Sequence, residues 1–355
     1  MKLLASAGTT SVMKIVRKVP RRVVLLVIVG LLVASVGAGI ALARGTAKPI
    51  GSGVVVIDTN LAYQGGAAAG TGMVLTSSGE VLTNNHVISG ATTIKVVVPK
   101  TGRSYSARVL GYNRTADVAL LQLQGASNLK TVSISSAKLS VGAKVKALGN
   151  AGGNGSITSA TGTVTGLGKS ITASDDAGGL EQLTGLIETN AGVEPGDSGG
   201  PLVNSQGKVV GMDTAASSGF GFQRISATDA YAIPIAKALT IAHAISSGKA
   251  SATVHVGATA FLGIEVESVA TPGSVGASGS GALIAGIVSG GPAASAGLVA
   301  GDVITALNGH TVTSPAAVSA FVLTKKPGAQ INVAYVDVSG ASHTASVTLG
   351  SGPPQ

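Results

Sequence analysis

The chain of 355 residues has no cysteine, no tryptophan and few aromatic residues, which make up 3% of it. Without cysteine, disulfide bonds and thiolate metal sites are excluded, so an exported domain has to rely on its hydrophobic core. The scarcity of aromatic rings removes the stacking platforms that bind single-stranded nucleic acid. Neither a metal nor another cofactor is predicted, because four of the histidines are scattered without ligand spacing: His243, His255, His310 and His343.

Acidic residues are missing from the start of the chain. Eight of the 24 lysines and arginines fall within residues 1–48, which contain no acid, and the remaining 16 are balanced by 15 acidic residues. The net charge of +9 therefore comes from the leader. The nearly neutral remainder offers no basic face for phosphate groups, which excludes nucleic acid as a partner.

The leader contains an uncharged apolar run over 23–43, which follows a basic segment over 1–22. At about 1.5 Å per residue, a helix of this length crosses a hydrocarbon core of roughly 30 Å. The basic segment would stay in the cytoplasm, so a linker over 44–52 would lead to domains outside the membrane. A cleaved signal peptide is the alternative, because Ala41-Leu42-Ala43 fits a cleavage site. Both interpretations export the rest of the chain.

From Gly53 onward, short runs of aliphatic and β-branched residues alternate with turn residues every eight to twelve positions. This pattern is typical of an all-β sandwich or barrel, and two similar sets of strands predict two barrels over 53–245. A helix over 233–245, with Pro234 near its first turn, is expected to close this domain. A linker over 246–258 follows.

The last part of the chain predicts an α+β domain over 259–350, with a short tail over 351–355. Its five strands are joined by a short helix at PAASAG and a longer helix at SPAAVSAFVL. In the longer helix, Ser314 is a suitable N-cap and Pro315 suits the first helical position.

Three short motifs place a histidine, an aspartate and a serine in this order: LTNNHVI around His86, TADVAL around Asp117 and EPGDSGGP around Ser198. A serine hydroxyl becomes a nucleophile when an imidazole takes its proton, and the imidazole needs a carboxylate that fixes its tautomer. His86 is therefore the predicted base, Asp117 the orienting acid and Ser198 the nucleophile. The glycines around Ser198 allow a tight loop whose backbone N–H groups, at Gly196, Asp197 and Ser198, form an oxyanion hole.

The letters Gly196 to Gly200 also fit the G-x-S-x-G nucleophile elbow of α/β-hydrolases. That fold requires the order Ser, Asp, His and a helix directly after the serine. Here the plausible histidine lies upstream, and the residues after Ser198 predict two short strands around a turn. The order of the three motifs therefore favours a two-barrel protease.

Three segments carry a resemblance to a known family: GTGMVLTSSGEVLTNNHVI, RTADVALLQL and ETNAGVEPGDSGGPLVN. They resemble the trypsin-like core of the HtrA/Deg serine proteases, closest to the actinobacterial membrane-anchored or secreted members. FLGI and GPAASAGLVAGDVITALNG resemble the PDZ domain of those enzymes. The resemblance implies a mainly β fold of two six-stranded barrels followed by an α+β PDZ domain. It also implies homotrimers. The family usually has Asn where Asp197 stands, and we interpret Asp197 as a solvent-facing or locally hydrogen-bonded loop acid.

The resemblance further implies a substrate pocket with Gly192 at its base and Thr214, Ala215 and Ala216 along its edge. Because Gly192 carries no acid, we expect cleavage after small or medium apolar residues. The PDZ domain is expected to add a peptide strand beside Ile264 and Val266. The N–H groups of Phe261, Leu262 and Gly263 would hold the peptide carboxylate. Val318 and Phe321 face either this groove or the core, and Val318 is the better groove candidate.

Two functions are compatible with the sequence. The first is an ATP-independent serine endopeptidase of the cell envelope that cuts unfolded or exposed polypeptides. The second is a catalytically silent PDZ-containing binding or chaperone module. The presence of all three triad residues favours the enzyme.

Overall fold

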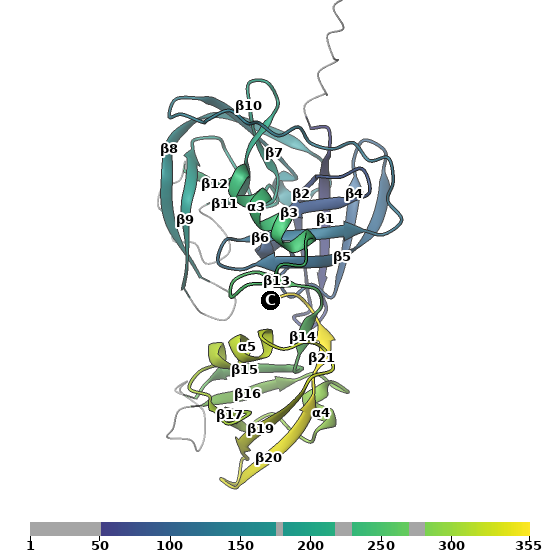
Figure 1. The fold of residues 1–355 in the computed structure, drawn as a ribbon, viewed down its shortest axis with the longest axis vertical. Coiled ribbons are helices and arrows are strands. Elements are labelled where there is room, and N and C mark those ends of the chain that lie inside the picture. Colours follow the sequence, from purple (N-terminus) through teal and green to yellow (C-terminus); the bar gives the residue numbers. More distant parts are fainter. Residues whose placement is uncertain (1–50, 175–179, 217–228, 270–280) are drawn as a thin grey trace, which may run out of the picture. The chain divides into compact units, whose positions relative to one another are not determined.

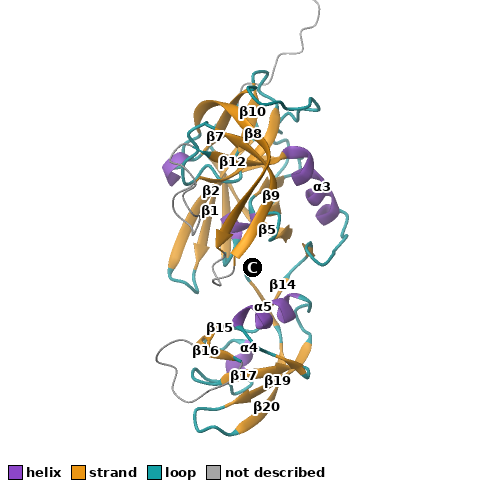
Figure 2. Ribbon diagram, turned by 90° about the vertical axis from the view of Figure 1, so that its left-hand side faces the viewer, coloured by secondary structure: helices purple, strands orange, loops and turns teal. Residues whose placement is uncertain are grey.

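The computed structural model describes residues 51–355, apart from 175–179, 217–228 and 270–280. The predicted basic segment and membrane-spanning run over 1–43, and nearly all of the first linker, lie outside the described residues. Among the helices that are described, none is long and apolar enough to cross a membrane. Strands dominate the described part, which confirms the mainly β prediction (Figure 2).

The first barrel is built from the strands before residue 124. They are β1 (Val54–Leu61), β2 (Gly66–Val74), β3 (Glu80–Thr83), β4 (Thr93–Val98), β5 (Arg103–Asn113) and β6 (Val118–Leu123). The order is β5-β4-β1-β2-β3-β6, and a pairing of β5 with β6 closes the ring. The apolar residues Val55, Ile57 and Val81 are 0% exposed and share one core cluster.

The second barrel has six further strands in a closed ring. They are β7 (Lys144–Gly149), β8 (Thr158–Ser174), β9 (Leu180–Thr189), β10 (Pro201–Asn204), β11 (Val209–Ala216) and β12 (Ala230–Pro234). A short 3-10 turn, η1 (Ala151–Gly153), follows β7. The structure thus confirms two six-stranded barrels.

Helix α3 (Ile235–Ser246) joins the two barrels (Figure 1). It contacts β5 and β6 of the first barrel and β11 and β12 of the second. Its buried face consists of Ile235, Ala238, Ala242 and Ile245. The prediction that the helix begins at residue 233 was wrong, because β12 continues through Pro234, whose backbone is extended with ψ of 130°.

The segment predicted as a linker over 246–258 is partly built into the first barrel. His255–Val256 form β13, which pairs with Tyr112 and Gly111 of β5. Val254 is 8% exposed. A strand of two residues is too short to show an alternating pattern in the sequence.

The C-terminal domain is an α+β unit, in which the described residues form ten helices and strands. They are β14 (Thr259–Phe261), β15 (Ile264–Ser268), β16 (Ala282–Ile287), α4 (Pro292–Ser295), β17 (Val303–Leu307), β18 (His310–Thr311), α5 (Pro315–Leu323), β19 (Gln330–Val336), β20 (Ser342–Thr348) and β21 (Gly350–Gly352). The main sheet has the order β15-β16-β17-β19-β20. The predicted N-cap is confirmed, since the Ser314 side chain accepts a hydrogen bond from the Ala317 N–H at 3.3 Å. β21, which reaches into the predicted tail, pairs with β14.

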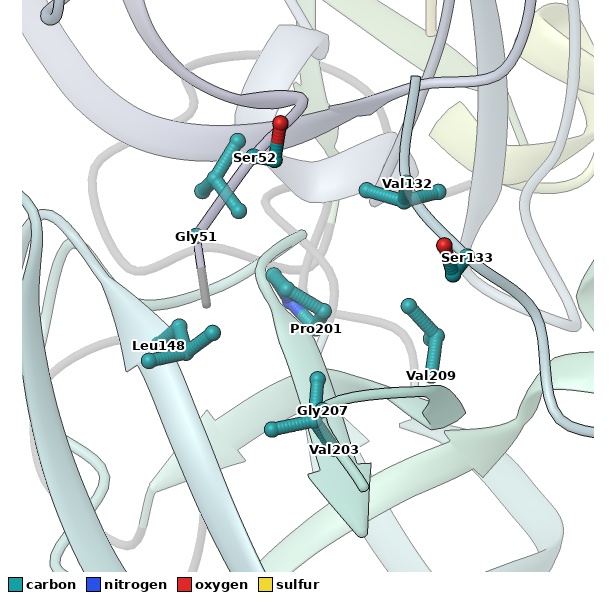
Figure 3. A pocket seen from close by; sticks show the side chains of 10 residues that line it. Gly51, Ser52, Val132, Ser133, Leu148, Pro201, Val203, Gly207 and Val209 are labelled. Atoms are coloured by element: carbon teal, nitrogen blue, oxygen red, sulfur yellow. The ribbon is translucent and has the colours of Figure 1, made fainter. Parts of the chain in front are cut away.

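A small cavity of about 20 Å³ lies where the chain enters the first barrel (Figure 3). Val54 and Val132 meet Leu148, Val203 and Val209 of the second barrel around it. None of the residues that line it is titratable, and its volume holds little more than one water molecule. The cavity is therefore too small for a substrate and offers no titratable group for catalysis.

Candidate active site

His86 and Asp117 meet because their two strands are neighbours. β3 ends at Thr83, which pairs with Ala119 near the start of β6. The chain after β3 turns into the short helix α2 (Asn85–Ile88), and the chain before β6 carries Asp117. Residues 31 positions apart in the sequence therefore lie side by side at one end of the first barrel.

The carboxylate of Asp117 holds His86 at two points. Asp117 Oδ2 lies 2.9 Å from His86 Nδ1, and Asp117 Oδ1 accepts the backbone N–H of His86 at 3.0 Å. Asp117 itself has a φ of 53°, a conformation that Asp tolerates better than most residues. The Asn84 side chain fixes this turn by donating to the Asp117 backbone oxygen at 2.9 Å. Asp117 thus fixes both the ring and the backbone of His86.

A third hydrogen bond reaches Asp117 from the second barrel. The Thr214 hydroxyl on β11 donates to Asp117 Oδ2 at 2.5 Å. Thr214 is 0% exposed and Asp117 is 6% exposed, so this contact is shielded from water. The sequence suggested that Thr214 borders the substrate pocket, but its side chain points toward the carboxylate that orients His86.

Ser198 lies in the loop between β9 and β10, and this loop is held from both barrels. The Thr71 N–H of β2 donates to the Ser198 backbone oxygen at 2.9 Å. On the other side, Gly199 and Gly200 exchange backbone hydrogen bonds of 2.8 Å with Asp213 of β11. A Cβ added at Gly70 would lie 2.6 Å from Val87 of α2 and 3.3 Å from the Ser198 oxygen. The Ser198 loop therefore lies close to the helix that carries His86.

The loop around Ser198 carries the N–H groups that were predicted to form the oxyanion hole. Gly196 has a φ of 99° and Gly199 a φ of 84°, values that favour glycine. In the described part of the chain, the N–H groups of Gly196 and Ser198 have no hydrogen-bond acceptor. The Asp197 N–H, in contrast, donates to the Glu194 oxygen at 3.0 Å. This contact removes Asp197 from the predicted oxyanion hole.

Asp197 is not a solvent-facing acid. It is 4% exposed, and its Oδ2 accepts the Glu194 N–H at 2.9 Å, so only the locally hydrogen-bonded part of that interpretation holds. Burial raises the pKa of the Asp197 carboxyl above its usual value, and the hydrogen bond from Glu194 partly opposes this effect.

A second buried acid, Asp213, was not singled out from the sequence. It is 0% exposed, and neither carboxyl oxygen has a hydrogen-bond partner among the described residues. Burial raises its pKa well above the usual value, and the nearby charge of Asp197 adds to the rise. The only sequence signal is an acid within the apolar run of β11, directly before Thr214.

Known protein families match the chain in two parts, which correspond to the two-barrel domain and the C-terminal domain. Residues 70–212 match the trypsin-like peptidase domain, and residues 260–349 match the PDZ domain. The serine protease PepD of Mycobacterium tuberculosis is 35% identical over 313 residues, covering 84% of this chain and 63% of PepD. The periplasmic pH-dependent serine endoprotease DegQ of Escherichia coli is 34% identical, covering 79% of this chain and 59% of DegQ.

This chain belongs to the HtrA/Deg family of trypsin-like serine proteases. Among solved structures, the HtrA-type protease AlgW with a tripeptide is 27% identical, covers 86% of this chain and 95% of AlgW, and has a TM-score of 0.48. The chain spans about three fifths of the length of PepD and DegQ.

In this HtrA/Deg protein, Gly192 lines an open cavity of about 360 Å³. The cavity is also lined by small side chains, including Ala147, Ala151 and Ala160, and by Glu194 and Asp197. No atom lies within 4 Å of the position that a Cβ would take at Gly192. Ala215 and Ala216 end β11, and their side chains lie outside the described residues.

The PDZ domain places two of its predicted peptide-binding residues, Ile264 and Val266, at one edge of its sheet. β15, with Ile264 and Val266, pairs with β16 and has no second partner among the described strands. Gly263, with a φ of 80°, joins β14 to β15, whereas the Leu262 side chain is 4% exposed and belongs to the core. Val318 of α5 is 3% exposed and also belongs to that core, so the groove prediction for its side chain is not supported by its position. Phe321 is partly buried against the same cluster.

Proposed function

We propose that this chain is a serine endopeptidase in which His86, Asp117 and Ser198 form the catalytic triad. The observation that carries the proposal is the double contact of Asp117 with His86, at 2.9 Å to the ring and 3.0 Å to the backbone. A carboxylate bonded to Nδ1 fixes the tautomer in which Nε2 takes up a proton. Membership of the HtrA/Deg family supports the same chemistry.

In the proposed reaction, Nε2 of His86 takes the Ser198 proton as the hydroxyl oxygen attacks the carbonyl carbon of the scissile bond. Negative charge develops on the carbonyl oxygen, where the N–H groups of Gly196 and Ser198 would stabilise it. His86 then gives its proton to the leaving amine, and water hydrolyses the acyl-enzyme by the same steps in reverse. Asp117 stabilises the imidazolium that forms on His86.

The substrates that we propose are unfolded or exposed polypeptide segments, cleaved after small or medium apolar residues. Small alanine side chains line the cavity beside Gly192, and Gly192 provides no acid to pair with a basic P1 residue. Glu194 is the competing determinant, because it is exposed and lines the same cavity. Profiling with a peptide library decides this point: Lys or Arg at P1 would assign specificity to Glu194.

We place the enzyme in the cell envelope, with both domains outside the membrane. Relatives such as DegQ are named periplasmic, and the basic, then apolar, start of the sequence favours export. We further propose a single membrane anchor at 23–43, ATP independence and a homotrimer. The homotrimer rests on family resemblance alone. The PDZ domain would recruit polypeptides or regulate cleavage by binding a peptide strand at β15.

Labelling with a fluorophosphonate probe tests the function. We expect labelling of the full chain that disappears in Ser198→Ala, together with cleavage of an unfolded protein. The measurement should be repeated in the presence of peptides that bind the PDZ domain, since an inactive resting loop would also block labelling. Folded protein that is labelled under neither condition would support the alternative, a catalytically silent binding or chaperone module.

A further inference from the structure

Thr71 of β2 is a fully buried residue whose hydroxyl forms its hydrogen bonds with the other barrel. It is 0% exposed and lies between two glycines, Gly70 and Gly72. Its Oγ1 donates to the Gly196 backbone oxygen at 2.7 Å and accepts the Asn150 N–H at 2.9 Å. Both partners belong to loops of the second barrel. The Thr71 hydroxyl therefore donates one hydrogen bond and accepts another, and both cross the interface between the barrels.

The backbone of Thr71 adds a third contact to the same loop. Its N–H donates to the Ser198 oxygen at 2.9 Å, while its own oxygen accepts the Thr83 hydroxyl at 2.8 Å within the first barrel. A Cβ at Gly199 would lie only 2.1 Å from the Thr71 oxygen. Thr71 thus touches the turn over 196–199 from end to end, and Thr83 anchors Thr71.

These contacts bear on the two N–H groups that face the substrate. The Gly196 N–H lies in the peptide plane of Pro195, whose oxygen accepts the Gly152 N–H at 2.8 Å. Gly152 belongs to η1, which begins directly after Asn150. The Asn150 N–H donates to the Thr71 hydroxyl. The other side of Gly196 is fixed through its oxygen by Thr71 Oγ1. One hydroxyl therefore restrains Gly196 directly and also through the Asn150 loop.

We propose that Thr71 is a positioning residue of the oxyanion site, which keeps the turn over 196–198 in the shape that presents the N–H groups of Gly196 and Ser198. The inference rests on the proposed endopeptidase function. Under this proposal, Thr71 lies in the first barrel and outside the triad, but it controls how the N–H groups of the second barrel contact the transition state. A misplaced donor weakens stabilisation of the developing oxyanion more than it weakens ground-state binding.

Thr71→Val tests this in the full chain, since valine keeps the shape and removes the hydroxyl. The Gly196 oxygen and the Asn150 N–H then lose their partner. Removing an oxyanion donor outright costs about 100- to 1,000-fold in kcat, so displacing it should lower kcat about 10- to 100-fold, with KM within about twofold. Thr71→Ser, which keeps the hydroxyl, should restore kcat to within about threefold of the wild type.

Thr59→Val is the matched control. Thr59 is 3% exposed, and its hydroxyl donates to the Ala68 oxygen at 3.1 Å within the first barrel. This variant also loses one buried threonine hydroxyl, but its kcat should stay at the wild-type value. Because Thr71→Val leaves two buried groups without a partner and Thr59→Val leaves one, the denaturation midpoint should fall further in Thr71→Val.

A wild-type kcat in folded Thr71→Val would overturn the inference, and so would a failure of Thr71→Ser to restore kcat. If Thr71→Val does not fold, Thr71→Cys replaces it, because a thiol fits the site and forms only weak hydrogen bonds. An unchanged kcat in Thr71→Cys would then overturn the inference as well. Failure of the proposed function looks different, since the wild type itself would show neither turnover nor probe labelling.

Discussion

Thr214 and Asp117 are joined by a hydrogen bond of 2.5 Å that links the second barrel to the carboxylate orienting His86. Replacing Thr214 with Val removes the donor and keeps the volume. A buried hydrogen bond to a charged group contributes about 1.5 to 3 kcal/mol, so we expect kcat/KM to fall roughly 10- to 100-fold. Steady-state kinetics with a peptide substrate measures the effect.

Thr214→Ser is the control for Thr214→Val, because serine can donate the same hydrogen bond. It should retain most of the activity. Equal losses in both variants would show that the packing of the threonine methyl group, not its hydroxyl, supports Asp117.

The buried carboxyl of Asp213 predicts a pH-dependent stability. Its pKa in the folded chain lies above the unfolded value of about 3.9, so the folded state binds more protons between these two values. The contribution of Asp213 to the free energy of unfolding is fully present below the unfolded pKa and is lost as the pH rises through the folded pKa. Each unit of difference corresponds to about 1.4 kcal/mol.

Asp213→Asn should remove this decline, because asparagine resembles the protonated acid and does not ionise. Urea unfolding between pH 4 and pH 9 should show a higher stability than the wild type at the alkaline end. Asp337→Asn is the control: hydrogen bonds from Ser339 and His343 lower the pKa of Asp337, so the stability that this acid contributes is lost only below about pH 4. Across the measured range, the Asp337→Asn profile should therefore run parallel to that of the wild type. Parallel pH profiles for the wild type and Asp213→Asn would contradict the prediction.

The sequence predicted the barrels and the order of His86, Asp117 and Ser198 because strand patterns and glycine-rich turns are local signals. It did not predict the role of Thr214, because the partner that uses its hydroxyl lies 97 positions away. Burial of Asp197 was missed for a similar reason: whether a loop acid faces water depends on how two barrels pack around it. The start of α3 was misplaced by two residues because Pro234 fits both a strand end and a helix start.

Gly192→Asp should change the substrate preference. No atom lies within 4 Å of the added Cβ, so a side chain can start at this position without a clash at its Cβ. An acid at this point would pair with a basic P1 side chain, and we expect kcat/KM for Lys or Arg relative to Ala at P1 to rise at least about tenfold. Gly192→Asn is the uncharged control. An equal preference in the two variants would show that Gly192 does not lie beneath the P1 side chain.

Gly199→Ala should abolish activity for a steric reason. The new Cβ would lie 2.1 Å from the Thr71 oxygen and 2.3 Å from Thr83 Oγ1, both well inside contact distance. The Ser198 loop would have to move away from the first barrel, and a displacement of about 1 Å in an active site can cost about 100-fold in rate. We expect at least this loss in kcat/KM and in the rate of fluorophosphonate labelling.

Gly168→Ala separates the clash from the backbone strain of an alanine at positive φ. Gly168 has a φ of 70°, close to the 84° of Gly199, but no atom lies within 4 Å of its Cβ position. Both variants carry a similar strain of about 1 to 2 kcal/mol, so their denaturation midpoints should fall, whereas only Gly199→Ala should lose activity. Full activity in Gly199→Ala would mean that the Ser198 loop and β2 can separate without cost, and the contacts of Thr71 with that loop would then have no part in catalysis.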